Sequence, residues 1–182
     1  GITAPGEVRS LAKASHSPRL AIDDDGLDWI SEFPHLRDLD LRSSDVTDTG
    51  LRKLGEFPSL QFLVLDGALH GMGGLASFSP PPGLRSLMLE RFRINQDDAD
   101  RFRRFSGLTY LCLNGTKLDD DTIGAMVRML PNLQHLCLKG TSIDGSCLDQ
   151  VASLGQLREL MLARTGVDDG DLQRLVPLRR LE

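Results

Sequence analysis

Hydrophobic residues recur along this chain in one phrase, LxxLxL, whose first, fourth and sixth residues are apolar. Its copies begin at Leu36, Leu60, Leu84, Leu108, Leu133 and Leu157. Successive copies therefore start 24 residues apart, except for one step of 25. Alternation between the fourth and sixth residues is the period of a strand with one buried face. Each copy predicts a short strand.

A second apolar pattern follows each strand. Apolar residues three apart, such as Leu51, Leu54 and Phe57, predict a short helix. Acidic residues at the strand-to-helix junction are expected to cap these helices, namely Asp48, Asp120 and Asp169. One such unit cannot bury its apolar face alone, so the units must stack with parallel strands about 4.8 Å apart. The pattern predicts an α/β solenoid.

The phrase LxxLxLxxT followed by VTDTGLRKL resembles the leucine-rich repeat family, over about residues 12–182. The closest resemblance is to its ribonuclease-inhibitor-like class with TDxGL, which is cysteine-containing or bacterial in type. The resemblance implies a curved horseshoe with a parallel sheet on its concave face and short helices on its convex face. Residues 1–35 are then an N-terminal cap and a degenerate first repeat. Residues 36–182 are six repeats and the beginning of a seventh.

The ninth position of the repeat departs from the family, which often has Asn or Cys there. A hydroxyl at this position, as in Thr116, can still bond a neighbouring backbone group, but Ala68 and Phe92 cannot. The strand ladder is therefore expected to be least regular at the second and third copies. Glycines and prolines between residues 71 and 82 further predict a non-helical segment in the second copy.

Composition and charge exclude several classes of function. The chain has 182 residues and a net charge of −5, which disfavours binding to nucleic acid. Arg and Phe interleave between residues 91 and 105, but Phe102 and Phe105 fall on buried helix positions, which leaves the arginines as a solvated face. No apolar run approaches the roughly 18 residues of a membrane span. Three cysteines without a framework spacing indicate a reducing compartment. We therefore expect a cytoplasmic protein, or an effector delivered into a host cytosol.

Cys112 and Cys137 occupy the fifth position of adjacent copies, each two residues after Tyr110 or His135. Zinc needs four ligands, and two thiols with one imidazole do not supply them, so no metal or other cofactor is expected. A Cys137 nucleophile with His135 lacks an orienting acid and an oxyanion donor, so no enzyme activity is expected. A disulfide between the two cysteines stays open, because it would need its strict geometry within a parallel ladder.

The third and fifth residues of each copy are expected to point out of the sheet onto the concave face. There they would form an exposed apolar strip with an Arg-containing polar rim, which is the anatomy of a protein interface. The candidate partner-binding residues are Phe62, Val64, Arg85, Met88, Glu90, Tyr110, Cys112, His135, Cys137, Arg158 and Met161.

The sequence thus predicts a non-enzymatic module that binds a partner protein on its concave face. The resemblance leaves two alternatives open. One is the substrate-recognition part of a larger enzyme, such as a ubiquitin-ligase receptor or a bacterial effector, and the other is an enzyme inhibitor. A further copy begins at Leu181, so the last repeat is expected to be uncapped and available for self-association.

Overall fold

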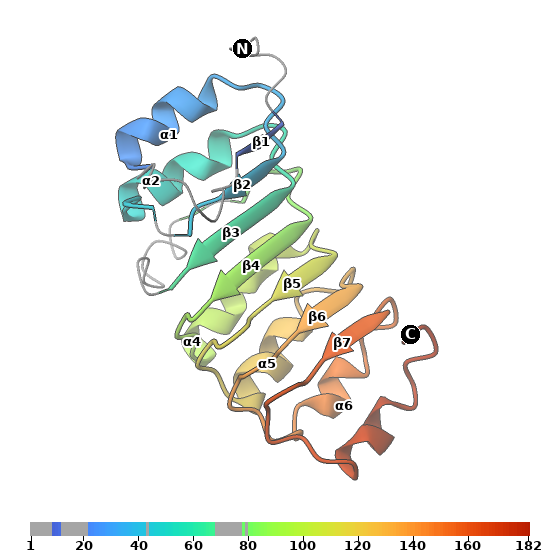
Figure 1. Ribbon diagram of the computed structural model, residues 1–182. Helices are drawn as coiled ribbons and strands as arrows, with labels where there is room; N and C mark the ends of the chain where they lie inside the picture. The colour runs from blue at the N-terminus through green and yellow to red at the C-terminus, as the bar shows by residue number, and fades with distance from the viewer. Residues whose placement is uncertain (1–8, 12–21, 43, 68–77, 79) are drawn as a thin grey trace.

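A computed structural model describes residues 9–11, 22–42, 44–67, 78 and 80–182 of the chain. Within these residues, seven parallel strands form one sheet in chain order (Figure 1). The strands are β1 (Ser10–Leu11), β2 (Asp38–Asp40), β3 (Phe62–Asp66), β4 (Ser86–Glu90), β5 (Tyr110–Cys112), β6 (His135–Cys137) and β7 (Glu159–Met161). Their register is continuous, because the leucine at the centre of each phrase pairs with the equivalent leucine of the next strand.

Short helices cover one side of this sheet, and the sheet lines the concave side (Figure 1). The α-helices are α1 (Asp24–Ser31), α2 (Asp48–Lys53), α4 (Gln96–Ala99), α5 (Asp120–Val127) and α6 (Leu148–Val151). Tighter 3-10 turns form η2 (Leu54–Glu56), η3 (Asp100–Phe105) and η4 (Asp171–Leu175). The predicted α/β solenoid with its parallel sheet and short helices is confirmed. None of the helices in the described ranges is long and apolar enough to cross a membrane.

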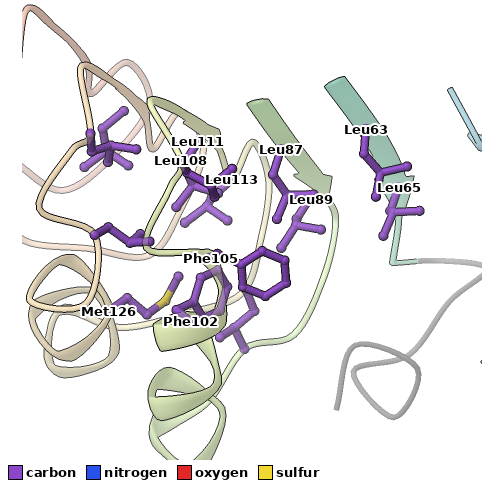
Figure 2. Packing of buried hydrophobic residues seen from close by; sticks show 14 of the residues in the cluster. Leu63, Leu65, Leu87, Leu89, Phe102, Phe105, Leu108, Leu111, Leu113 and Met126 are labelled. Carbon is purple, nitrogen blue, oxygen red and sulfur yellow. The ribbon is translucent and has the colours of Figure 1, made fainter. Parts of the chain in front are cut away.

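The core lies between the sheet and the helices and consists mainly of the repeated leucines. Leu39, Leu63 and Leu87 are fully buried. The predicted burial of Phe102 and Phe105 is also confirmed, and both rings lie beneath the strand leucines in Figure 2. Burial of one such side chain contributes about 1.5–3 kcal/mol, so the stacked copies share a substantial apolar core.

Two helix caps lie one residue before the predicted Asp48 and Asp120, and the third prediction, Asp169, is wrong, because η4 is preceded by Gly170 without a side-chain cap. Thr47 caps α2, and its side-chain oxygen accepts from the amide of Thr49. Asp119 caps α5 in the same way by accepting from Thr122. Asp48 and Asp120 are instead the first residues of their helices, where a carboxylate still favours the positive end of the helix dipole.

The ninth position behaves as expected where it has a hydroxyl. The buried Thr116 Oγ1 donates to the carbonyl of Leu89, 2.9 Å away in the preceding repeat. The expected irregularity of the strand ladder at the second and third copies is wrong, since their strands β3 and β4 pair over five residues. The Phe92 ring is 1% exposed and joins the leucine core, so apolar burial replaces the missing hydroxyl bond. Ala68 and residues 71–77 and 79 of the second copy's glycine- and proline-rich segment lie outside the described residues.

Candidate protein-binding face

The concave face is built from the side chains that alternate with the core leucines along each strand. The third residues of the six phrases form one column across the strands: Asp38, Phe62, Ser86, Tyr110, His135 and Glu159. The fifth residues form the second column: Asp40, Val64, Met88, Cys112, Cys137 and Met161. Because neighbouring residues of a strand point to opposite faces, both columns lie away from the leucine core.

Three members of the second column are buried, which corrects the expectation of a wholly exposed strip. Val64 and Cys112 are 1% exposed and Cys137 is 5% exposed, although none of the three belongs to the leucine core. Each has a short side chain, and its strand carries a longer one two residues earlier: Phe62 before Val64, Tyr110 before Cys112 and His135 before Cys137. Because the three are buried outside the leucine core, other side chains of the concave face must cover them. The three residues therefore lie below the accessible surface of the concave face, and a partner would contact the longer side chains around them.

The accessible apolar surface comes from the longer side chains of the same two columns. Phe62, Met88 and Tyr110 are half-buried, and Met161 is 43% exposed. The rings of Tyr110 and His135 lie 5.9 Å apart with their planes tilted by 34°. His135 Nδ1 lies 3.0 Å from Glu159 Oε2, which links β6 to β7. Burial raises the pKa of the Tyr110 phenol, so this side chain stays neutral at physiological pH.

Two hollows lie on this side of the sheet, one toward each end. The first has a volume of 390 Å³, and its lining includes Asp38, Asp40, Phe62, Val64 and Met88. The second has a volume of 420 Å³ and is lined by Gln134, His135, Arg158, Glu159 and Glu182. The first hollow combines apolar walls with carboxylates, whereas the second is mainly polar.

One charged pair, Arg42 with Asp40, lines the first hollow, and further charged pairs lie on the strands next to it. Arg42 Nη2 lies 2.6 Å from Asp40 Oδ2, and Arg42 Nη1 lies 3.5 Å from Glu90 Oε1. The hydrogen bonds with Asp40 raise the pKa of the Arg42 guanidinium further. Asp66 is 2% exposed and forms an ion pair with Arg91. Arg42 is not among the predicted binding residues, although its seventh position places it in the same column as Glu90.

The two predicted rim arginines lie outside these columns. Arg85 is exposed, but its Nη1 donates to the carbonyl of Leu84 over 3.0 Å, so the guanidinium turns back toward its own loop. Arg158 is exposed and lies 3.5 Å from Glu182 at the second hollow. The structure therefore brings Arg158 together with His135 and leaves Arg85 at the edge.

The cysteines on this face are free thiols. Within the described ranges, no group of three or more His, Cys, Asp or Glu side chains is placed to hold a metal ion. The face therefore offers apolar contact, hydrogen bonds and charge, which are the means of molecular recognition.

The fold defined by these stacked strands, turns and helices is that of a leucine-rich-repeat solenoid. Solved structures of internalins from Listeria monocytogenes are similar to it. One is an internalin (inlF) that is 17% identical, with a TM-score of 0.51 over 84% of this chain and 48% of that chain. Another is internalin C2, which is 20% identical, with a TM-score of 0.62 over 88% of this chain and 74% of that chain. The chain thus spans about half of the first internalin's length, and the likeness establishes the fold alone.

No protein-family model matches the sequence, and no curated protein sequence matches it.

Proposed function

We propose that this chain is a non-enzymatic interaction module whose concave face binds a partner protein. One observation carries the proposal: accessible apolar side chains from β3, β4, β5 and β7 share a single face, which also holds two hollows and a charged border. An apolar centre inside a polar rim that includes Arg is typical of protein interfaces. The opposite side of the sheet is covered by the helices and cannot serve this role.

The first hollow indicates which chemistry the partner presents. Its walls include Phe62 and Met88, and the Asp38 and Asp40 carboxylates lie at its side. Asp40 already pairs with Arg42, whereas Asp38 forms no ion pair with any described residue. A partner segment with an apolar side chain next to a Lys or Arg would fill this hollow and neutralise Asp38. Such a complex would weaken as salt concentration rises.

The finer class of the repeats is part of the same proposal. We assign them to the TDxGL, ribonuclease-inhibitor-like class of 24-residue repeats, with residues 1–35 as a cap and degenerate repeat and 36–182 as six repeats and the start of a seventh. The buried Gly50 of the TDTGL motif, which packs beside Asp24 of the preceding helix, supports this assignment. The free thiols of Cys112, Cys137 and Cys147 support a reducing cytosol, that of the cell or of a host, as the site of action.

The last repeat supports a second, weaker contact, which is self-association. Apolar side chains are exposed around the final strand and turn: Met161 at 43%, Leu172 at 45%, Val176 at 63% and Leu181 at 37%. Exposed apolar side chains beside the last strand of a sheet favour association with a second copy of the chain.

To test the concave face, the wild type and two variants are each used to capture binding proteins from a cell lysate. The variant Met88→Asp/Met161→Asp places carboxylates on two strands of the face. The control Trp29→Asp makes the same change on α1, where the side chain is 77% exposed on the opposite side. A protein captured by the wild type is purified, and its Kd is then measured for all three.

We expect the double variant to raise the Kd by about tenfold or more. Changing a side chain at the centre of an interface typically costs over ~1 kcal/mol of binding free energy. Trp29→Asp should bind like the wild type, and thermal melts by circular dichroism should show that both variants are folded. Equal affinity of the folded double variant, or loss of binding only in Trp29→Asp, refutes the proposal.

A further inference from the structure

Cys112 and Cys137 occupy paired positions on adjacent strands. Cys112 of β5 lies beside Cys137 of β6 in the parallel register. Adjacent strands are about 4.8 Å apart, which falls within the Cα separation of about 4.4–6.8 Å that a disulfide accepts. Both side chains point to the concave side, so a bond between the two sulfur atoms needs no separation of the backbones.

The two thiols interact with each other and with polar neighbours. The Cys137 thiol donates a hydrogen bond to Asn114 Oδ1, 2.8 Å away. The Cys112 side chain is close enough to the Cys137 sulfur to change the pKa of Cys137. Cys147 directly precedes α6 and is buried in the leucine core, apart from this pair, so it serves as a reference thiol within the same chain.

The surroundings of the two thiols shift their pKa values in opposite directions. The hydrogen bond from Cys112 lowers the pKa of Cys137 despite its burial, and the backbone amide and ammonium group of Lys139 add to this effect. The same hydrogen bond, together with burial, raises the pKa of Cys112. Of the two thiols, Cys137 is therefore the one that ionises first, by releasing the proton that it donates to Asn114, while Cys112 keeps its proton. Cys137 is also the more accessible of the two, at 5% exposure against 1%.

We propose that Cys112 and Cys137 form a redox-active dithiol, which hydrogen peroxide converts to a disulfide that joins β5 to β6. The Cys137 thiolate attacks one peroxide oxygen, so an S–O bond forms and the O–O bond breaks. The departing hydroxide takes up a proton and leaves as water, and Cys137 becomes a sulfenic acid.

The second step closes the bond. The Cys112 sulfur attacks the Cys137 sulfur, the S–O bond breaks, and the departing hydroxide takes the Cys112 proton to form a second water. Two electrons have passed from the thiols to the peroxide. Consumption of the Cys137 thiolate also removes the main cause of the raised Cys112 pKa, which makes Cys112 a better nucleophile at the moment it is needed.

The test treats the purified chain with hydrogen peroxide and digests it with trypsin without reduction. The three cysteines fall in three different tryptic peptides, 105–117, 129–139 and 140–158. Mass spectrometry should find peptide 105–117 joined to 129–139, with the loss of two hydrogen atoms. The link should disappear on treatment with dithiothreitol, and the peptide that contains Cys147 should keep its free thiol.

Variants separate the roles of the two cysteines. Cys112→Ser should stop at a sulfenic acid on Cys137 that dimedone traps, and Cys147→Ser should form the link at the wild-type rate. Cys137→Ser should leave Cys112 unoxidised. The proposal is overturned if the treated wild type, measured without any variant, keeps both thiols, links either cysteine to Cys147, or forms only disulfides between molecules.

Discussion

At the scale of single residues, Asp120 shows how a repeat is tied to the next one. The place of Asp120 at a strand-to-helix junction predicts a helix cap, but Asp119 is the residue that caps α5. Asp120 instead accepts the backbone amides of Asp144 and Cys147, each over 2.9 Å, and that of Gly145 over 3.2 Å. Asp24 makes the equivalent link to Thr47. These partners lie a full repeat away, so no local pattern reveals them.

Asp120 should make stability depend on pH. Burial opposes its ionisation, but the amides of Asp144, Cys147 and Gly145 outweigh this and lower its pKa. A carboxylate with a lowered pKa in the folded state stabilises the protein above its unfolded pKa of about 3.9, and this contribution is lost as pH falls through the folded pKa.

Asp120→Asn should therefore lower the free energy of unfolding at pH 7 by about 1.5–3 kcal/mol, since a bond to a charged group is lost. The difference from wild type should shrink at pH 3. Urea denaturation at both pH values measures it, and Asp121→Asn, an exposed neighbour on α5, is the control. A deficit that is equally large at pH 3 contradicts the role of the charge.

The concave residues mark the limit of sequence-based prediction. The period of the phrase correctly predicts that the leucines at its fourth and sixth positions face the core, because side-chain direction along a strand is a local property. In the last copy Leu160 and Leu162 are only partly buried. The same period predicts that Val64, Cys112 and Cys137 face the concave side, but not that they are covered. Their exposure depends on the length of side chains on other strands, such as Met88 and Tyr110, which only the three-dimensional structure defines.

At the scale of elements, the helices differ in how closely they pack. Gly50 in α2 is buried, and a methyl group there would lie 2.8 Å from Val46 Cγ1 and closer still to the Asp24 carboxylate. Gly124 in α5 is also buried, but a methyl group there would meet the Gln150 side chain at 3.4 Å, which is an ordinary contact. The same substitution should therefore have opposite effects at the two sites.

Gly124→Ala should raise the free energy of unfolding by up to about 1 kcal/mol, because Ala favours the helix over Gly. Gly50→Ala should lower it by about 1–3 kcal/mol, because the added methyl group displaces the carboxylate that holds Thr47. Urea denaturation of both variants checks this. Stabilisation by Gly50→Ala would show that α1 and α2 are not packed as described.

At the scale of the whole molecule, the exposed apolar side chains of η4 and its C-terminal end, Leu172 and Val176, predict association between copies. Sedimentation velocity should show the wild-type mass rising with concentration. Leu172→Lys/Val176→Lys, on an exposed turn, should remain monomeric and folded. A wild type that stays monomeric at every concentration, or a variant that associates equally well, excludes this contact.

The stacking itself was largely predictable, because six in-frame phrases can bury their leucines only by lying side by side. The detailed shape of the concave face could not be predicted from the sequence. Arg42 reaches Glu90, two strands away, and so borders a hollow that no single repeat contains. The surface is a property of the assembled sheet.

The most direct test of the central claim maps where a partner lies on the solenoid. A photo-reactive amino acid is placed at Met88 or Tyr110 on the concave face, or at the exposed Arg103 or Arg128 of the helical side, and irradiated with the captured partner. Cross-links from Met88 and Tyr110 that exceed those from the two arginines are the predicted result. Cross-links that come mainly from Arg103 and Arg128 would contradict a binding site on the concave face.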